Sequence, residues 1–160
     1  MPENAPYLSL WQTACFSPLQ PYESVTRQYE SLGVRFSRAI ALRPSNPDFI
    51  ADPNGLVLMP TNTGQGITLH LRRSIVQVQL QVMGSQPVVL FSLDGAGYCV
   101  AQGQLHQPAP LQRFNSNPQG AWQQCLTLAT HAVRTVRIGS KAPLWSIASR
   151  YAISISLRTA

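Results

Sequence analysis

The stretch of sequence that decides the fold runs Val76-Gln77-Val78-Gln79-Leu80-Gln81-Val82. Apolar and amide side chains alternate here with a period of two, which is the period of a β-strand that has one buried and one exposed face. An α-helix would distribute the same residues around its axis. The stretch therefore predicts a strand with its valine and leucine side chains in a core and its glutamines outside.

The same alternation recurs along the chain from Val34 onward. It is found at residues 34–37, 67–72, 126–128, 136–138 and 153–157. Residues 87–93 form a nearly continuous apolar run, which predicts a central strand, and Asp94-Gly95-Ala96-Gly97 then predicts the turn of a hairpin. About eight or nine short strands without intervening helices predict an all-β fold, namely an antiparallel β-sandwich or a barrel. The small residues 61–66 are expected to form a hairpin loop.

One short segment near the N-terminus predicts a helix. Pro21 suits a first-turn position, Val25, Tyr29 and Leu32 follow at i, i+4 and i+7, and Gly33 stands where a helix C-cap would. We therefore expect one short N-terminal helix of about three turns. Nothing later in the chain repeats this period.

Residues 1–20 form an N-terminal arm, and residues 21–160 are predicted to form a single β-sandwich domain. The arm contains Trp11 and Phe16 among other large apolar side chains, which are too hydrophobic to remain in water. We expect it to pack either on its own domain or on a partner. The total of 160 residues suits one domain.

Charge is scarce in this chain. Charged residues make up 11% of it, against a usual share of about 25%, while 44% is hydrophobic, and this combination excludes intrinsic disorder. Twelve basic and six acidic residues give a net charge of +6. Apart from Arg72-Arg73 the basic residues stand singly, so no basic run marks a nucleic-acid interface. Nucleic acid is therefore not an expected partner.

The three cysteines, Cys15, Cys99 and Cys125, show no CxxC spacing and are odd in number. We predict three free, buried thiols; a disulfide between Cys99 and Cys125 is the alternative if the chain is exported. The N-terminus lacks the charged and apolar regions of a signal peptide, and no apolar run approaches the ~20 residues of a membrane span. These features predict a cytoplasmic protein without a transmembrane segment.

Catalysis is not predicted. Asp94 is the only acidic residue beyond residue 52, and His70, His106 and His131 are scattered, so neither a carboxylate pair nor a triad can be assembled from spacing. No cofactor is expected.

A calcium site is the weak metal candidate. Asp48, Asp52 and Asn54 offer oxygen ligands in a proline-rich segment, whereas calcium takes six to eight oxygens. The alternative is a turn over Pro53-Asn54-Gly55 that begins at Asp52. We favour the turn and expect no bound metal.

The predicted binding surface is a polar sheet face. Gln77, Gln79 and Gln81 project from one strand, and we expect the neighbouring strand to present His70 and Arg72 beside them. Amide donors and acceptors next to a guanidinium suit recognition of a peptide or of a neutral, hydroxyl-rich ligand. The alternative is a solvated face that merely avoids charge.

A second group of candidate binding residues lies on and after the segment from residue 103 to 120. It comprises Arg113, Phe114, Asn115 and Trp122. An exposed aromatic side chain with nearby amides can stack on a sugar ring or insert into a protein partner. The alternative is that Phe114 and Trp122 fold back into the core.

The order of these motifs resembles that of jelly-roll, galactose-binding-like sandwich domains of bacterial and cyanobacterial proteins. The resemblance covers residues 29–158 and is carried by Tyr29-x-x-Leu32-Gly33-Val34-x-Phe36, the alternating pair at 67–82, Asp94-Gly95-x-Gly97 and Val133-x-x-Val136-x-Ile138. It implies ligand binding without catalysis, through loops at one end of the sandwich or through a polar sheet face.

The sequence thus predicts a non-catalytic interaction module or accessory subunit that docks on a protein partner. The apolar arm and the predominance of arginine among the basic residues motivate this hypothesis. The alternative is a carbohydrate-binding, lectin-like domain that uses the glutamine and arginine face together with Phe114 and Trp122.

Overall fold

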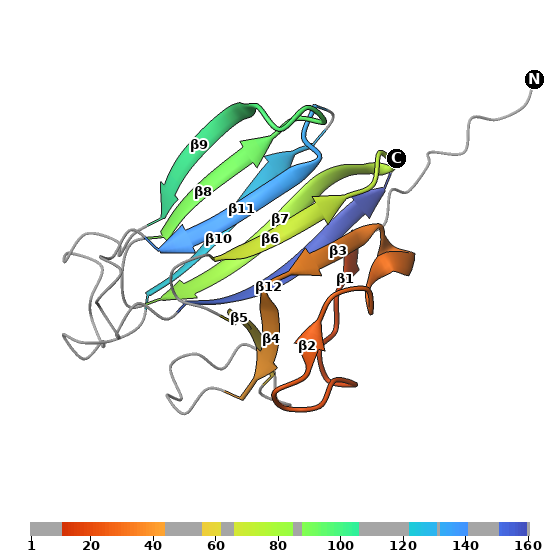
Figure 1. The fold of residues 1–160 in the computed structure, drawn as a ribbon, viewed down its shortest axis with the longest axis vertical. Coiled ribbons are helices and arrows are strands. Elements are labelled where there is room, and N and C mark those ends of the chain that lie inside the picture. Colours follow the sequence, from red (N-terminus) through yellow and green to blue (C-terminus); the bar gives the residue numbers. More distant parts are fainter. Residues whose placement is uncertain are drawn as a thin grey trace, which may run out of the picture.

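Two antiparallel sheets face each other in the computed structural model (Figure 1). The structure describes residues 11–43, 56–61, 66–84, 88–105, 122–130, 132–140 and 151–159. The seven-stranded sheet contains, in spatial order, β10 (Trp122–Ala129), β7 (Ile75–Gly84), β12 (Tyr151–Thr159), β5 (Val57–Pro60), β4 (Ala39–Leu42) and β2 (Ser24–Val25), with β1 (Trp11–Thr13) paired to β12. The five-stranded sheet contains β3 (Val34–Ser37), β6 (Ile67–Leu71), β11 (Thr135–Ser140), β8 (Val88–Leu93) and β9 (Cys99–Leu105). The predicted all-β antiparallel sandwich is confirmed.

β7 is the central long strand that its sequence predicts. Val78, Leu80 and Val82 are fully buried, and Leu80 lies opposite Leu126 of β10 on one side and Ile155 of β12 on the other. Because the side chains of a strand alternate between faces, the glutamines between them point away from the core. Residues 76–82 thus form an interior strand of this sheet, with their apolar side chains directed to the core.

The five-stranded sheet confirms the predicted hairpin after residue 93. The backbone N–H of Asp94 donates to the carbonyl of Tyr98 at 2.9 Å, and Asp94 Oδ1 accepts from the N–H groups of Ala96 and Tyr98 at 2.9 Å each. This Asx-type turn fixes the β8–β9 pairing. β8 lies between β11 and β9, so the apolar run does form an interior strand.

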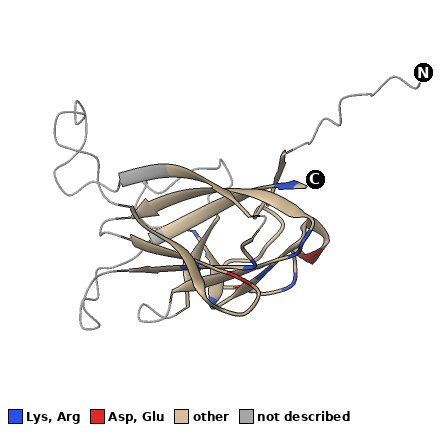
Figure 2. Ribbon diagram, turned by 90° about the horizontal axis from the view of Figure 1, so that it is seen from above, with Lys and Arg blue, Asp and Glu red and all other residues tan. Residues whose placement is uncertain are grey.

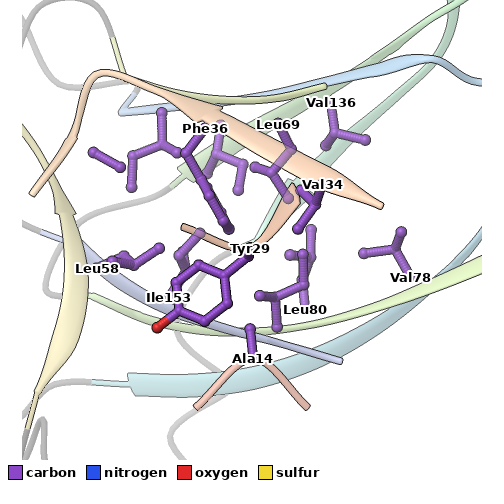
Figure 3. Packing of buried hydrophobic residues seen from close by; sticks show 14 of the residues in the cluster. Ala14, Tyr29, Val34, Phe36, Leu58, Leu69, Val78, Leu80, Val136 and Ile153 are labelled. Carbon is purple, nitrogen blue, oxygen red and sulfur yellow. The ribbon is translucent and has the colours of Figure 1, made fainter. Parts of the chain in front are cut away.

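Tyr29 lies at the centre of the core between the two sheets (Figure 3). Its ring makes edge-on contacts with Phe16 and Phe36, with ring centroids 5.5 and 6.1 Å apart. Its hydroxyl donates a hydrogen bond to the backbone carbonyl of Cys15 at 2.5 Å. The described part of the N-terminal arm therefore packs on its own domain, with Phe16 and Leu19 buried in the same core.

The predicted N-terminal helix is wrong except for one turn. Residues 24–25 form β2, which pairs with β4, and only Glu30–Leu32 form a 3₁₀ helix. Burial of Val25 and Tyr29 in the sandwich core outweighs the weak helical preference of this segment. Gly33 does act as the predicted left-handed C-cap, with φ of 92° and its N–H bonded to the carbonyl of Glu30.

The prediction also missed strands β1, β2, β4 and β5, which are short and alternate weakly. The predicted hairpin loop at residues 61–66 is wrong, because β5 and β6 belong to different sheets. Residues 62–65 lie outside the described residues; Gly66, which follows them, adopts φ of 68°.

The three cysteines are free, as predicted, but they are exposed rather than buried. Cys99 and Cys125 lie on strands of different sheets, so they are not neighbours in a ladder. Each falls at an outward or edge position where water reaches it. Within the described ranges, no helix is long and apolar enough to cross a membrane.

Candidate functional site

The outer face of the seven-stranded sheet carries an ordered set of mostly uncharged polar side chains. We call this surface the glutamine face; it consists of Trp11 and Thr13 (β1), Ser154, Ser156 and Arg158 (β12), Gln77, Gln79 and Gln81 (β7), and Cys125 and Thr127 (β10). Strand register aligns these residues in rows. Thr13, Ser156, Gln79 and Thr127 form one row, and Trp11, Arg158 and Gln77 form the next.

Hydrogen bonds between neighbouring strands hold the three glutamine side chains in place. Arg158 Nη1 donates to Gln77 Oε1 at 2.9 Å, and Ser154 Oγ donates to Gln81 Oε1 at 3.1 Å. Gln79 Nε2 donates to Cys125 Sγ at 3.2 Å. Within the described part of the chain, the NH₂ groups of Gln77 and Gln81 and the carbonyl of Gln79 keep unused hydrogen-bonding capacity. The face thus presents both donors and acceptors in fixed positions.

A shallow hollow of about 260 Å³ lies in the middle of the glutamine face. Its lining residues are Gln79, Gln81, Cys125, Ser154, Ile155 and Ser156. A depression of this size accommodates part of a small ligand and leaves the rest in water.

Charge is almost absent from the glutamine face. Arg158 is the only charged residue in the sequences of β1, β7, β10 and β12. Figure 2 shows one charged segment beside the C-terminus, where β12 ends, and most of the other charged segments lower in the view. The face therefore favours ligands that form hydrogen bonds without carrying a charge.

The structure does not bring His70 and Arg72 to the glutamines. We expected them on the strand next to the glutamines, and this expectation is wrong because β6 belongs to the five-stranded sheet while β7 belongs to the seven-stranded sheet. The turn between them carries the chain from one sheet to the other. The guanidinium beside Gln77 is supplied by Arg158 instead.

His70 and Arg72 belong to a separate polar cluster on the five-stranded sheet. His70 Nε2 lies 3.0 Å from Ser37 Oγ, and Arg72 forms a 3.4 Å ion pair with Glu30. Arg35 also donates from Nε to Glu30 at 2.8 Å, and this hydrogen bond is the main reason that the pKa of Glu30 is lowered. Glu30 Oε1 thus accepts hydrogen bonds from both guanidinium groups, so this cluster is a local ion-pair network.

Several predicted residues cannot be placed. Arg113, Phe114 and Asn115 lie outside the described residues, as do the calcium candidates Asp48, Asp52 and Asn54. Trp122 begins β10, but its side chain is not described. Across the described residues, no group of three or more His, Cys, Asp or Glu side chains could hold a metal ion.

Sequence reasoning missed Trp11, Ser154, Ser156 and Arg158 as members of this surface. A signal was present, since Ile153-Ser154-Ile155-Ser156-Leu157 alternates as clearly as residues 76–82 do. The pairing of β12 with β7, which joins segments more than 70 residues apart (Ser154 opposite Gln81), has no local signal. Assigning the outward residues of both strands to one face required the tertiary structure.

The architecture defines a β-sandwich domain with a polar sheet face. No family model and no curated protein matches the sequence. Among solved structures, the chain is similar to the K2 cleaved adhesin domain of Lys-gingipain, with a TM-score of 0.55 and 11% identity over 95% of this chain and 99% of that one. It is also similar to the K1 cleaved adhesin domain of Lys-gingipain from Porphyromonas gingivalis W83, with a TM-score of 0.48 and 8% identity over 94% of this chain and 99% of that one. A third similar structure is TmCBM61 in complex with β-1,4-galactotriose, with a TM-score of 0.36 and 10% identity over 87% of this chain and 88% of that one. The likeness to the K2 domain agrees with the β-sandwich fold.

Proposed function

We propose that this protein is a non-catalytic binding module whose glutamine face recognises a neutral, hydroxyl-rich ligand, namely a carbohydrate. The observation that carries the proposal is the row of three glutamines on β7, each held by a hydrogen bond to a neighbouring strand within a face that has one charged side chain. The resemblance to galactose-binding-like domains, which implies binding through a polar sheet face or end loops, points the same way.

Carbohydrate hydroxyls both donate and accept hydrogen bonds, and amide side chains do the same. A side chain that is already oriented loses less conformational entropy when it binds a ligand. The interstrand bonds to Gln77, Gln79 and Gln81 provide this orientation. Recognition of an uncharged ligand then needs no opposite charge on the protein.

Trp11 gives the glutamine face an aromatic edge. Trp11 is 42% exposed, and it lies directly opposite Arg158 in the β1–β12 ladder. Indole rings offer a flat apolar surface with a polar N–H, which suits packing against the C–H face of a pyranose ring. We expect Trp11 to bound one end of the ligand site.

The test is titration calorimetry of the full chain against a panel of neutral oligosaccharides. With the best binder of the panel, Gln79→Ala should weaken binding about five- to tenfold, because it removes about 1 kcal/mol of hydrogen bonding. Gln20→Ala is the matched control, since Gln20 is an exposed glutamine that lies outside the glutamine face. A panel without any binder, or equal losses in both variants, contradicts the proposal.

Docking on a protein partner, as an accessory subunit, is the second candidate. It is favoured by two tyrosines that are far from buried, Tyr22 at 77% and Tyr98 at 73% exposure. Aromatic side chains that are exposed on a free domain are typical anchors of protein interfaces. Under this hypothesis a stoichiometric partner co-purifies with the wild-type chain and is lost from Tyr98→Ala or Tyr22→Ala, while the carbohydrate panel gives no binding.

A further inference from the structure

The two sides of the sandwich have very different strand edges. β3 and β4 belong to different sheets and are joined through Arg38 alone. The β3 edge of the five-stranded sheet and the β4–β2 edge of the seven-stranded sheet therefore lie on the same side of the sandwich. The edge strands β9 and β10 lie on the opposite side (Figure 1). On the first side the edge strands are short, with four residues in β3 and two in β2. Arg27, Glu30 and Arg35 surround them. Short edges flanked by charge are a usual protection against pairing with another chain.

The opposite side lacks this protection. β9 has seven residues and β10 has eight, and neither sequence contains a charged residue or a proline. Along β9, every residue from Cys99 to Gln104 is exposed, so the strand is open on both of its faces. Among the described strands, β9 pairs with β8 alone. A long, uncharged edge strand of this kind is a template for a further strand.

The local geometry of β9 suits such pairing. Its register with β8 is continuous from Val88 opposite Leu105 to Ser92 opposite Ala101, and the irregularity falls only beyond it, at the turn end. No atom lies within 4 Å of the position where a side chain on Gly103 would begin. Ala101 and Gly103 therefore add little bulk to one face of β9, beside which the side chains of a partner strand would lie.

We propose that a second copy of this chain docks on β9 in antiparallel orientation about a two-fold axis, which makes the five-stranded sheets of two copies continuous. Two identical strands satisfy each other's outward backbone groups in this arrangement. The net charge of +6 would oppose association through most surfaces, but β9 brings no charge to the contact. β10 is equally uncharged, but its described side chains alternate between exposed and partly buried, whereas those of β9 are exposed throughout, so we assign the contact to β9.

This inference goes beyond the proposed function and does not depend on it. The glutamine face belongs to the other sheet, so the dimer leaves it open on both copies. A dimer would present two ligand faces to one polymeric ligand and so raise its apparent affinity.

The experiment is sedimentation velocity of the full chain over a range of concentrations, with the double variant Gln102→Lys/Gln104→Lys. The wild type should shift from monomer to dimer as the concentration rises, and the double variant, which brings four positive charges to the contact, should stay monomeric. Both substituted side chains are exposed, and circular dichroism should show an unchanged fold. A wild type that remains monomeric throughout, or a double variant that still dimerises, overturns the proposal.

A cross-linking measurement tests the same contact without added charge. In a background with Cys15, Cys99 and Cys125 changed to serine, Gln102→Cys should form a covalent dimer on mild oxidation. Ser31→Cys, which is exposed on the opposite side of the sandwich, is the control. Equal cross-linking rates in the two variants contradict pairing through β9. If the edge instead accepts a strand of a different protein, the purified chain stays monomeric in both experiments, which also overturns the proposal.

Discussion

Arg158 and Gln77 face each other across β12 and β7, and the guanidinium of Arg158 donates a 2.9 Å hydrogen bond to the side-chain carbonyl of Gln77. The same bond turns the NH₂ group of Gln77 away from Arg158. This residue pair therefore positions two groups at the Trp11 end of the glutamine face, namely the one charged side chain of the face and the NH₂ donor of Gln77.

Replacement of Arg158 by methionine should weaken carbohydrate binding about fivefold or more, because Gln77 loses the partner that orients its amide. Methionine keeps most of the apolar stem of the side chain. Binding of a neutral ligand by the wild type should depend little on salt. Calorimetry at low and high ionic strength measures both effects, with Arg137→Met on the other sheet as the control; a steep salt dependence would point to an anionic ligand.

Tyr29→Phe should lower the free energy of unfolding by about 1–2 kcal/mol, because it removes the hydrogen bond to the Cys15 carbonyl while leaving the aromatic packing in place. Chemical denaturation measures this change. Tyr22→Phe is the matched control, since Tyr22 is 77% exposed, and it should leave stability unchanged. Equal effects of the two substitutions would show that the Tyr29 hydroxyl does not tie the N-terminal segment to the domain.

Alkaline pH should destabilise the wild type in a way that depends on Tyr29. Burial, helped by the nearby Cys15 and Glu23, raises the pKa of Tyr29 from 10.0 to about 12. Between these two values the unfolded chain loses the phenolic proton while the native protein keeps it, so stability present below pH 10 falls as the pH rises, by up to about 1.4 kcal/mol per pH unit. Denaturation curves at several alkaline pH values should show a shallower decline for Tyr29→Phe, and parallel declines would contradict this assignment.

Gly66→Ala should destabilise the protein by more than about 2 kcal/mol or prevent folding. Gly66 adopts φ of 68°, and an added Cβ would lie 2.0 Å from the backbone carbonyl oxygen of Ile138. Gly139→Ala is the control, because nothing lies within 4 Å of its Cβ position and no positive φ is found there. The melting temperature of Gly66→Ala should lie well below that of the control in thermal unfolding. Similar melting temperatures would mean that the backbone at residue 66 can move away from the Ile138 carbonyl to make room for a Cβ.

Thr130→Val should lower the free energy of unfolding by about 1–3 kcal/mol with almost no change in volume. Thr130 is fully buried, and its hydroxyl donates a 2.6 Å hydrogen bond to the backbone carbonyl of Ile75 at the start of β7. Thr127→Val, at an exposed position of β10, is the control and should have little effect. A neutral Thr130→Val substitution would show that water or another group can satisfy the Ile75 carbonyl.

The sequence predicted strands correctly where one face of the strand is buried and the other is exposed to solvent. Residues 76–82 and the Asp94 turn predicted β7 and the β8–β9 hairpin, because alternation and turn chemistry are local properties. Residues 21–32 were predicted as a helix and instead provide β2 and one 3₁₀ turn. There the burial of Val25 and Tyr29 against distant strands outweighed a short helical pattern.

By itself the sequence determined which side chains of β7 and β12 face inward, and that charge is scarce, because both follow from the order and kinds of residues along the chain. The tertiary structure alone decided that Gln77 lies beside Arg158 and not beside Arg72, and that β9 and β10 end the sheets on one side. These relationships depend on which strands pair and on which sheet each strand joins. Strand pairing over long sequence separations is selected by packing of the whole core, which no local pattern encodes.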